Sequence, residues 1–174
     1  MLPEKKKKRG KLGENKLIKL LLKYGYEQVK SWEDFDRSKK CVASFSKDVF
    51  SFDESKKKLG IRLKTHNQGK MLDLLIKIEG KLFVLEAKHL NIGGGEQNKQ
   101  IDELIKILEL KEQKEHVFYV SFLDGTYSNK LIVGEISKRA KKLGMQRKQI
   151  EDSLEKKDAK NYWVNTAGFI ALFK

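Results

Sequence analysis

The sequence MLDLLIKIEGKLFVLEAK, residues 71–88, decides the fold of this chain. Its two halves, residues 71–78 and 82–88, are apolar runs that contain the Ile, Val and Phe common in β-strands. The short link Glu79-Gly80-Lys81 between them is typical of a tight turn. The pattern therefore predicts an antiparallel β-hairpin with its turn at residues 79–81.

Three charged side chains interrupt these apolar strands. Side chains alternate between the two faces of a strand, so Glu86 and Lys88 project together from one face. Asp73 is expected across the hairpin from residues 86–88, where cross-strand Cβ atoms are about 5 Å apart. Charges at the edge of an apolar core cost free energy unless they are paired or bind a metal.

Two adjacent carboxylates repel each other, but they suit Mg²⁺, a hard cation that takes oxygen ligands and keeps several waters. The spacing therefore predicts a Mg²⁺ site at Asp73 and Glu86, with Lys88 beside it. The alternative is a surface salt-bridge cluster, which contributes only about 0–1 kcal/mol to stability. The apolar residues around the three charges disfavour that alternative.

Helices and further strands are predicted around this hairpin. The predicted helices are Asn15–Tyr26, Gln97–Leu110, Lys130–Leu143 and Gln146–Lys156, the last two separated near Gly144. The predicted strands lie within Val42–Phe52, at His116–Phe122 and at Gly168–Phe173, and Ser55–Lys70 is predicted as a loop with room for a short strand at Ile61–Leu63. This order indicates an α/β (α+β) fold in which a mixed central sheet is flanked by helices.

The chain is strongly basic, with a net charge of +14 from 38 Lys and Arg against 24 Asp and Glu. This charge predicts a polyanionic partner, with nucleic acid first and an anionic membrane surface second. The alternative is a lysine-rich surface that serves only solubility or thermal stability. No apolar stretch of the sequence approaches the roughly 20 residues needed to span a bilayer, so we expect no membrane partner.

The length of 174 residues fits one compact domain. Residues 1–13 are rich in Lys and Gly and predict a flexible basic arm, which leaves residues 14–174 as a single domain. The lone Cys41 cannot form an internal disulfide, and no apolar signal-peptide core follows the basic N-terminus. We therefore expect a cytoplasmic protein.

Asp73 followed by Glu86-Ala87-Lys88 resembles the D…(D/E)xK signature of the PD-(D/E)xK nuclease superfamily. The residue before the Asp, often Pro in that superfamily, is Leu72 here. A helix that opens with Gly13-Glu14, the hairpin and the helix after it also resemble the superfamily core, over roughly residues 13–123. The resemblance implies a restriction-endonuclease-like core with Asp73, Glu86 and Lys88 as catalytic residues.

Within the superfamily the chain most resembles the FokI-type cleavage domain of type IIS restriction enzymes. There a (D/E)-T-K triplet is followed by a Gly-Gly loop and by a helix that begins Q-x-D-E. Here Lys88 is followed by Gly93-Gly94-Gly95 and by Gln100-Ile101-Asp102-Glu103, with Gln100 at the same offset from the lysine. The strand Tyr119-Val120-Ser121 and the segment Thr126-Tyr127-Ser128 after it are also similar. No separate recognition domain is obvious, which leaves open a partner recognition subunit.

The resemblance implies that Asp73 and Glu86 hold Mg²⁺ with the backbone carbonyl of Ala87, and that Lys88 orients or deprotonates the attacking water. A glutamate of the first helix joins the metal site in several superfamily members, which makes Glu14 a further candidate ligand. An equally favoured alternative is that Glu14 only complements the dipole at the start of its helix. Polar residues flanking the site suit phosphate and base-edge contacts, although each alone is also typical of a solvated loop. These candidate DNA-binding residues are Lys64, His66, Asn67, Gln68, Lys70, His89, Asn91, Lys99 and Gln100.

Together these observations predict a metal-dependent DNA endonuclease of the type II restriction kind, which hydrolyses phosphodiester bonds in double-stranded DNA. Cutting both strands needs two active sites, so a homodimer or dimerisation on DNA is expected. One alternative is a structure-specific nuclease similar to Holliday junction resolvases. Another is a non-catalytic DNA-binding module that keeps the nuclease fold, which the intact Asp73, Glu86 and Lys88 disfavour.

Overall fold

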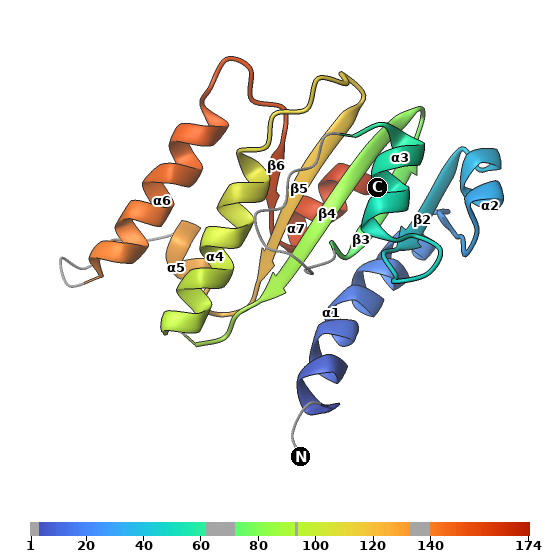
Figure 1. Cartoon of the computed structure of the whole chain (residues 1–174). Coiled ribbons are helices and arrows are strands. Elements are labelled where there is room, and N and C mark those ends of the chain that lie inside the picture. The colour runs from blue at the N-terminus through green and yellow to red at the C-terminus, as the bar shows by residue number, and fades with distance from the viewer. Residues whose placement is uncertain (1–3, 62–71, 93, 133–139) are drawn as a thin grey trace.

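Within the described residues, one mixed β-sheet of six strands has helices on both of its faces (Figure 1). The computed structural model describes residues 4–61, 72–92, 94–132 and 140–174. The strands are β1 (Glu27–Gln28), β2 (Lys40–Ser44), β3 (Leu74–Ile78), β4 (Lys81–His89), β5 (Val117–Asp124) and β6 (Tyr162–Val164). The helices are α1 (Glu4–Lys23), α2 (Trp32–Arg37), α3 (Phe52–Leu59), α4 (Gly95–Leu108), α5 (Asn129–Ile132), α6 (Lys141–Leu154) and α7 (Thr166–Phe173).

The order of strands across the sheet follows the chain, from β1 at one edge to β6 at the other. β2, β3 and β4 are antiparallel neighbours, whereas β1 pairs parallel with β2. β5 pairs parallel with β4, and β6 pairs parallel with β5. A parallel connection needs a long crossover, which α4 provides between β4 and β5. The predicted mixed sheet flanked by helices is therefore confirmed.

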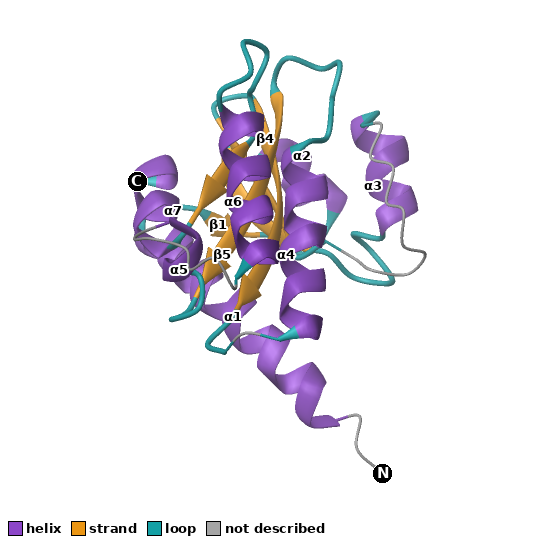
Figure 2. Ribbon diagram, turned by 90° about the vertical axis from the view of Figure 1, so that its left-hand side faces the viewer, coloured by secondary structure: helices purple, strands orange, loops and turns teal. Residues whose placement is uncertain are grey.

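The apolar core has two layers, one on each face of the sheet. Helices cover both faces (Figures 1 and 2). α1 and α7 cover one face, where they pack on Phe83 and Leu85 of β4. α3 and α4 cover the other face, with α2 at the β1 edge and α6 packed beside α4. Leu82 and Val84 of β4 point to that second layer, because alternate side chains of a strand face opposite sides.

The predicted hairpin is confirmed. β3 and β4 pair antiparallel from Leu74↔Leu85 to Ile78↔Lys81. The two turn residues both have positive φ, 49° for Glu79 and 77° for Gly80. Positive φ at both positions matches the twist of the flanking strands in a two-residue hairpin turn.

The first helix is longer than the sequence indicated. α1 begins at Glu4 rather than Asn15, so the predicted start of this helix is wrong, and residues 4–13, which the sequence predicted as a flexible basic arm, are helical. Lys, Arg, Leu and Glu are good helix formers, and Gly10 and Gly13 do not end the helix that the buried Leu17 and Leu21 anchor. No helix among the described residues, α1 included, is long and apolar enough to cross a bilayer.

The segment between the first strand pair and the hairpin is helical. β2 ends at Ser44 and α3 occupies Phe52–Leu59, so the predicted strand through Phe52 and the predicted loop from Ser55 are wrong there. The reason is the cap at Ser51, whose hydroxyl accepts a hydrogen bond from the Glu54 amide at 3.2 Å. The predicted short strand at Ile61–Leu63 falls almost wholly in residues 62–71, outside the described residues.

The predicted closing strand Gly168–Phe173 is also wrong, because these residues belong to helix α7. The Asn165 side chain caps the helix and accepts a hydrogen bond from the Gly168 amide at 3.0 Å. Phe169 and Phe173 lie one helical turn apart, and both are buried against the α1 face of the sheet. The apolar run 168–173 fits a helix or a strand by sequence alone. Because Phe169 and Phe173 are buried on the same side at helical spacing, the helix is favoured.

The helices near residue 144 also differ from the prediction. Gly144 does not separate two helices, because its amide donates to the Ala140 carbonyl at 3.1 Å as part of α6. Of the predicted helix Lys130–Leu143, α5 covers the first residues, and residues 133–139 lie outside the described residues. β1, α2 and β6 were not predicted; they are short elements of two, six and three residues.

The turn after β5 requires glycine at position 125. Gly125 has φ of +105°, and a Cβ built there would lie 2.3 Å from the Leu90 carbonyl oxygen. Leu90 is tied to the same turn, since its amide donates to the Asp124 carbonyl at 2.8 Å and its carbonyl accepts from the Tyr127 amide at 2.9 Å. The ends of β4 and β5 can approach this closely only without a side chain.

Gly125→Ala is therefore expected to lower the free energy of unfolding by about 3 kcal/mol, from backbone strain and the clash with Leu90. Urea denaturation followed by circular dichroism measures the loss. Gly80→Ala is the matched control, because Gly80 also has positive φ but no atom lies within 4 Å of the added Cβ. It should cost only about 1 kcal/mol. Equal losses for the two variants would contradict the role of the close approach.

Candidate metal-binding and catalytic site

The hairpin brings Asp73 and Glu86 together at its open end. Leu74 pairs with Leu85, so Asp73 and Glu86 follow as the next residues on the two strands. The Asp73 amide donates to the Leu85 carbonyl at 3.0 Å, and the Ala87 amide donates to Asp73 Oδ2 at 2.7 Å. These two hydrogen bonds hold the Asp73 carboxylate against β4.

Lys88 lies on the same face of β4 as Glu86, and the two side chains form an ion pair between Lys88 Nζ and Glu86 Oε1. The Lys88 side chain is 18% exposed and the Glu86 side chain is 10% exposed. The pair is therefore largely enclosed, unlike the exposed salt-bridge cluster weighed as an alternative. The structure thus brings the three predicted catalytic residues to one place.

Asp73 has an unusual acidity. Burial, followed by the negative charge of Glu86, raises its pKa to about 7, and the Ala87 hydrogen bond and the Lys88 charge offset only part of this. Two carboxylates in one enclosed site cannot both ionise freely. Strongly perturbed carboxyl groups are common at catalytic and metal-binding sites, and also occur in structural ion-pair networks.

Lys88 keeps its charge in this setting. Burial acts to lower its pKa, but the carboxylates of Glu86, Asp73 and Glu103 outweigh that effect and hold the pKa above its usual value. A lysine of this kind is a stable cation near neutral pH. Its surroundings suit charge stabilisation better than proton abstraction.

Glu14 approaches the site from α1. It is half-buried, and its charge is the smallest of the contributions that raise the pKa of Asp73. The middle of α1 therefore lies close enough to the hairpin for this carboxylate to influence the site.

The donor set fits a hard divalent cation that keeps most of its water. No group of three or more His, Cys, Asp or Glu that could hold a metal occurs within the described ranges. Mg²⁺ is usually held by only one or two carboxylates, with waters and substrate phosphate as its other ligands. Asp73 and Glu86 supply such a pair, and a cation between them would relieve the repulsion that raises the pKa of Asp73.

Sequence reasoning missed Glu103 as a member of this site. Glu103 lies on α4 and its Oε2 is 3.9 Å from Lys88 Nζ, with the Glu103 side chain 21% exposed. The sequence did contain an indication of this contact: Glu103 lies between Ile101 and Leu104, two α4 residues that are buried against the sheet. Helical spacing alone did not show that this flank of α4 faces the end of β4.

The candidate DNA-binding residues fall into two groups. Lys64, His66, Asn67, Gln68 and Lys70 lie in residues 62–71, outside the described residues. His89 and Lys99 are exposed, and Gln100 is half-buried in the second turn of α4. His89 follows Lys88 directly but points to the opposite face of β4.

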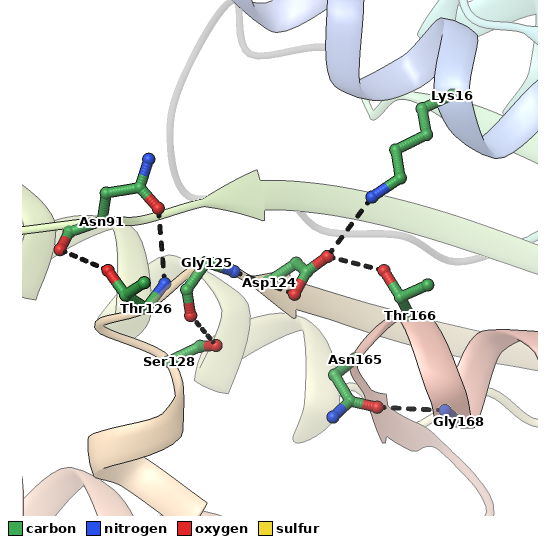
Figure 3. Close-up of polar contacts among 9 residues, drawn as sticks. All are labelled: Lys16, Asn91, Asp124, Gly125, Thr126, Ser128, Asn165, Thr166 and Gly168. Carbon is green, nitrogen blue, oxygen red and sulfur yellow. Dashed lines mark hydrogen bonds and ion pairs between the residues drawn. The ribbon is translucent and has the colours of Figure 1, made fainter.

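Asn91 has a structural role. Its side-chain oxygen accepts a hydrogen bond from the Thr126 amide at 3.3 Å, and its carbonyl accepts one from the Thr126 hydroxyl at 2.8 Å (Figure 3). These bonds connect the loop after β4 with the loop after β5. Because its Oδ1 already accepts this bond, Asn91 is less free to recognise a base edge than its sequence position indicated.

Asp124 connects three elements at the end of β5 (Figure 3). Its carboxylate accepts from the Thr166 hydroxyl of α7 at 2.5 Å and lies 3.7 Å from Lys16 Nζ of α1. Burial acts to raise the pKa of Asp124, but hydrogen bonds from Thr166 and Gly125 and nearby positive charges hold it below its usual value. Lys16 belongs to the part of α1 that also carries Glu14.

Comparisons of the chain with protein-family models, with curated proteins and with solved structures found no match.

The metal-free protein should lose stability as the pH rises through the titration of Asp73. The folded-state pKa of about 7 lies above the usual value of 3.8 for an aspartate, so the folded protein binds this proton more tightly than the unfolded chain. The contribution is fully present below about pH 4 and is lost by about pH 7. Asp73→Asn, which keeps an oxygen for the Ala87 amide, should raise the free energy of unfolding at pH 8 by about 1–3 kcal/mol.

Urea denaturation in chelator at pH 5 and pH 8 measures this effect, which should be smaller at pH 5, where Asp73 is still protonated in the folded protein and only part of its contribution has been lost. Asp48→Asn is the control, because it removes one carboxylate charge from an exposed loop residue. A pH profile that is the same in the parent protein and in Asp73→Asn would show that Asp73 is not perturbed.

Proposed function

We propose that this protein is a Mg²⁺-dependent endonuclease that hydrolyses phosphodiester bonds in double-stranded DNA, most similar to type II restriction endonucleases of the PD-(D/E)xK superfamily. The observation that carries the proposal is the convergence of Asp73, Glu86 and Lys88 at the enclosed end of one hairpin. The net charge of +14 supports a nucleic acid as the substrate.

The arrangement of elements supports a restriction-endonuclease-like core. A helix with an acidic residue beside the site, α1, precedes the hairpin that carries the signature. A crossover helix, α4, then leads into β5, which lies parallel to β4. These features agree with the order that the sequence resemblance implies.

In this proposal Asp73 and Glu86 hold the metal, with the Ala87 carbonyl and Glu14 as further candidate ligands. When bound, Mg²⁺ supplies polarisation of the scissile phosphate and a lowered pKa for its bound water. Lys88, whose pKa is held above its usual value, acts as a fixed cation that offsets negative charge growing on the phosphate. The same shift makes Lys88 a poor general base, so orientation of the water is the better assignment.

DNA is proposed to lie across the end of β4 and the start of α4. The exposed Lys99 and the half-buried Gln100 lie in the first turns of α4 and suit phosphate contacts. His89 is exposed as well, but its side chain lies on the face of β4 opposite Lys88. Cleavage of both strands requires two copies of the site, so the protein is proposed to act as a homodimer or to dimerise on DNA. The alternative is that a partner recognition subunit determines which DNA sequence is cut.

Incubation of unmethylated phage DNA with Mg²⁺ near physiological salt should give discrete fragments. Non-specific attraction to the backbone falls steeply with salt, whereas base-edge hydrogen bonds depend on it less. Excess chelator should abolish the reaction, and Ca²⁺ should support DNA binding without cleavage. A four-way DNA junction offered beside linear duplex tests the resolvase alternative. Cleavage that persists in chelator would sink the metal-dependent proposal, and a uniform smear at every salt concentration would exclude site recognition.

Asp73→Ala, Glu86→Ala and Lys88→Ala should each reduce the cleavage rate at least about 100-fold, and combinations should lose little more because the residues act as one unit. Single-turnover kinetics on a defined duplex measures the rates. Lys81→Ala is the matched control, because Lys81 is an exposed lysine at the turn end of the same strand. A Lys88→Ala variant with the rate of Lys81→Ala would remove Lys88 from the proposed mechanism.

A further inference from the structure

Lys88 stands between two carboxylates that come from different elements. Glu86, two residues before it on β4, forms an ion pair with it. Glu103, on α4, places its Oε2 3.9 Å from Lys88 Nζ. The three side chains are between 10% and 21% exposed, so water screens them only in part.

The position of Glu103 is fixed by how α4 packs. Ile101, Leu104, Ile105 and Leu108 are buried against the sheet and α6, which sets the rotation of the helix. Asp102, the residue before Glu103, faces α6 instead: it lies 2.9 Å from Lys142 Nζ and accepts a hydrogen bond from Gln146 at 2.8 Å. Two adjacent acidic residues of one helix thus face different neighbours.

The pairing of Lys88 with Glu86 competes with a metal ion at the same carboxylate. Glu86 cannot give its full charge to a cation while its Oε1 is held by Lys88. A buried ammonium whose paired carboxylate is taken up by a metal loses part of its charge compensation, which opposes metal binding. A second carboxylate within reach removes this obstacle, because the ammonium can shift toward it.

We infer that Glu103 is a positioning residue that takes over Lys88 when Glu86 binds the divalent cation, and so sets the metal affinity of the site. This inference rests on the metal-dependent function proposed above. It assigns Glu103 no direct contact with the metal or with DNA. Glu103 acts through Lys88, and it keeps the ammonium beside the site rather than against the metal ligand.

Isothermal titration calorimetry with Ca²⁺ and with Mn²⁺, in the absence of DNA, tests the inference. Glu103→Gln keeps the shape of the side chain and removes its charge, and it should weaken metal binding about tenfold. Asp102→Asn is the matched control, since it removes the same charge one residue away on the face toward α6, and it should change the affinity less than about twofold. Thermal unfolding of each metal-free variant shows whether it is folded.

A double-mutant cycle separates action through Lys88 from the general attraction of a negative charge. Lys88→Met should not weaken metal binding, and adding Glu103→Gln to it should change the affinity less than about twofold. An equal tenfold loss in both backgrounds would overturn the inference, because Glu103 would then act on the metal directly. Unchanged affinity in Glu103→Gln alone would also overturn it.

The outcome is separable from that of the proposed function. Metal affinity is measured without DNA, so the cycle can succeed even if the protein cleaves no duplex, in which case the nuclease proposal fails alone. If the parent protein cleaves DNA while Glu103→Gln binds metal normally, the inference fails alone. A parent protein that binds neither metal ion overturns both.

Discussion

The enclosed pair of carboxylates at the end of the hairpin is the constraint on which the site depends. Asp73 is held against β4 by the Ala87 amide, and Glu86 follows Leu85 on that strand, so neither can move apart from the other without opening the pairing. Their repulsion, together with burial, raises the pKa of Asp73 to about 7. The fold therefore holds an unfavourable arrangement at one point, where a cation removes the penalty.

The surrounding elements hold the two strands in a position that the hairpin alone could not maintain. An isolated hairpin is marginally stable in water, and here β2 and β5 extend it on both sides. At the end of β5, Asp124 holds α7 through Thr166 and α1 through Lys16. The burial of Leu17, Ile18 and Leu21 against the sheet positions α1, which carries Glu14 near the site.

The hairpin, α4 and the mixed sheet could be predicted because their signals are local. Alternation and a Gly-bearing turn specify β3 and β4, and Asp73 and Glu86 follow from the register. α7 was mispredicted because its apolar run fits strand or helix, and α3 because its polar, Lys-rich sequence is also typical of a loop. The side-chain caps at Ser51 and Asn165 mark where these two helices begin. Glu103 was missed for a different reason. Its contact with Lys88 joins a helix to a strand, and only the packing angle of α4 creates it.

The charge of the whole chain and the charge of the site have opposite signs, and this difference bears on the order of events at the site. A net charge of +14 draws a polyanion to the protein from a distance. Close to the hairpin, however, Asp73, Glu86 and Glu103 surround one Lys88. A phosphate would meet net repulsion there, and Coulomb energy at short range in an enclosed site exceeds the screened attraction of distant surface charges. On the proposed function, a divalent cation bound between the carboxylates cancels the net charge of about −2 that three carboxylates and one ammonium give, and so removes the repulsion that a phosphodiester would otherwise meet. On the proposed function, the basic surface attracts DNA from a distance, and the bound metal then allows a phosphate to enter the site. These are two separate steps.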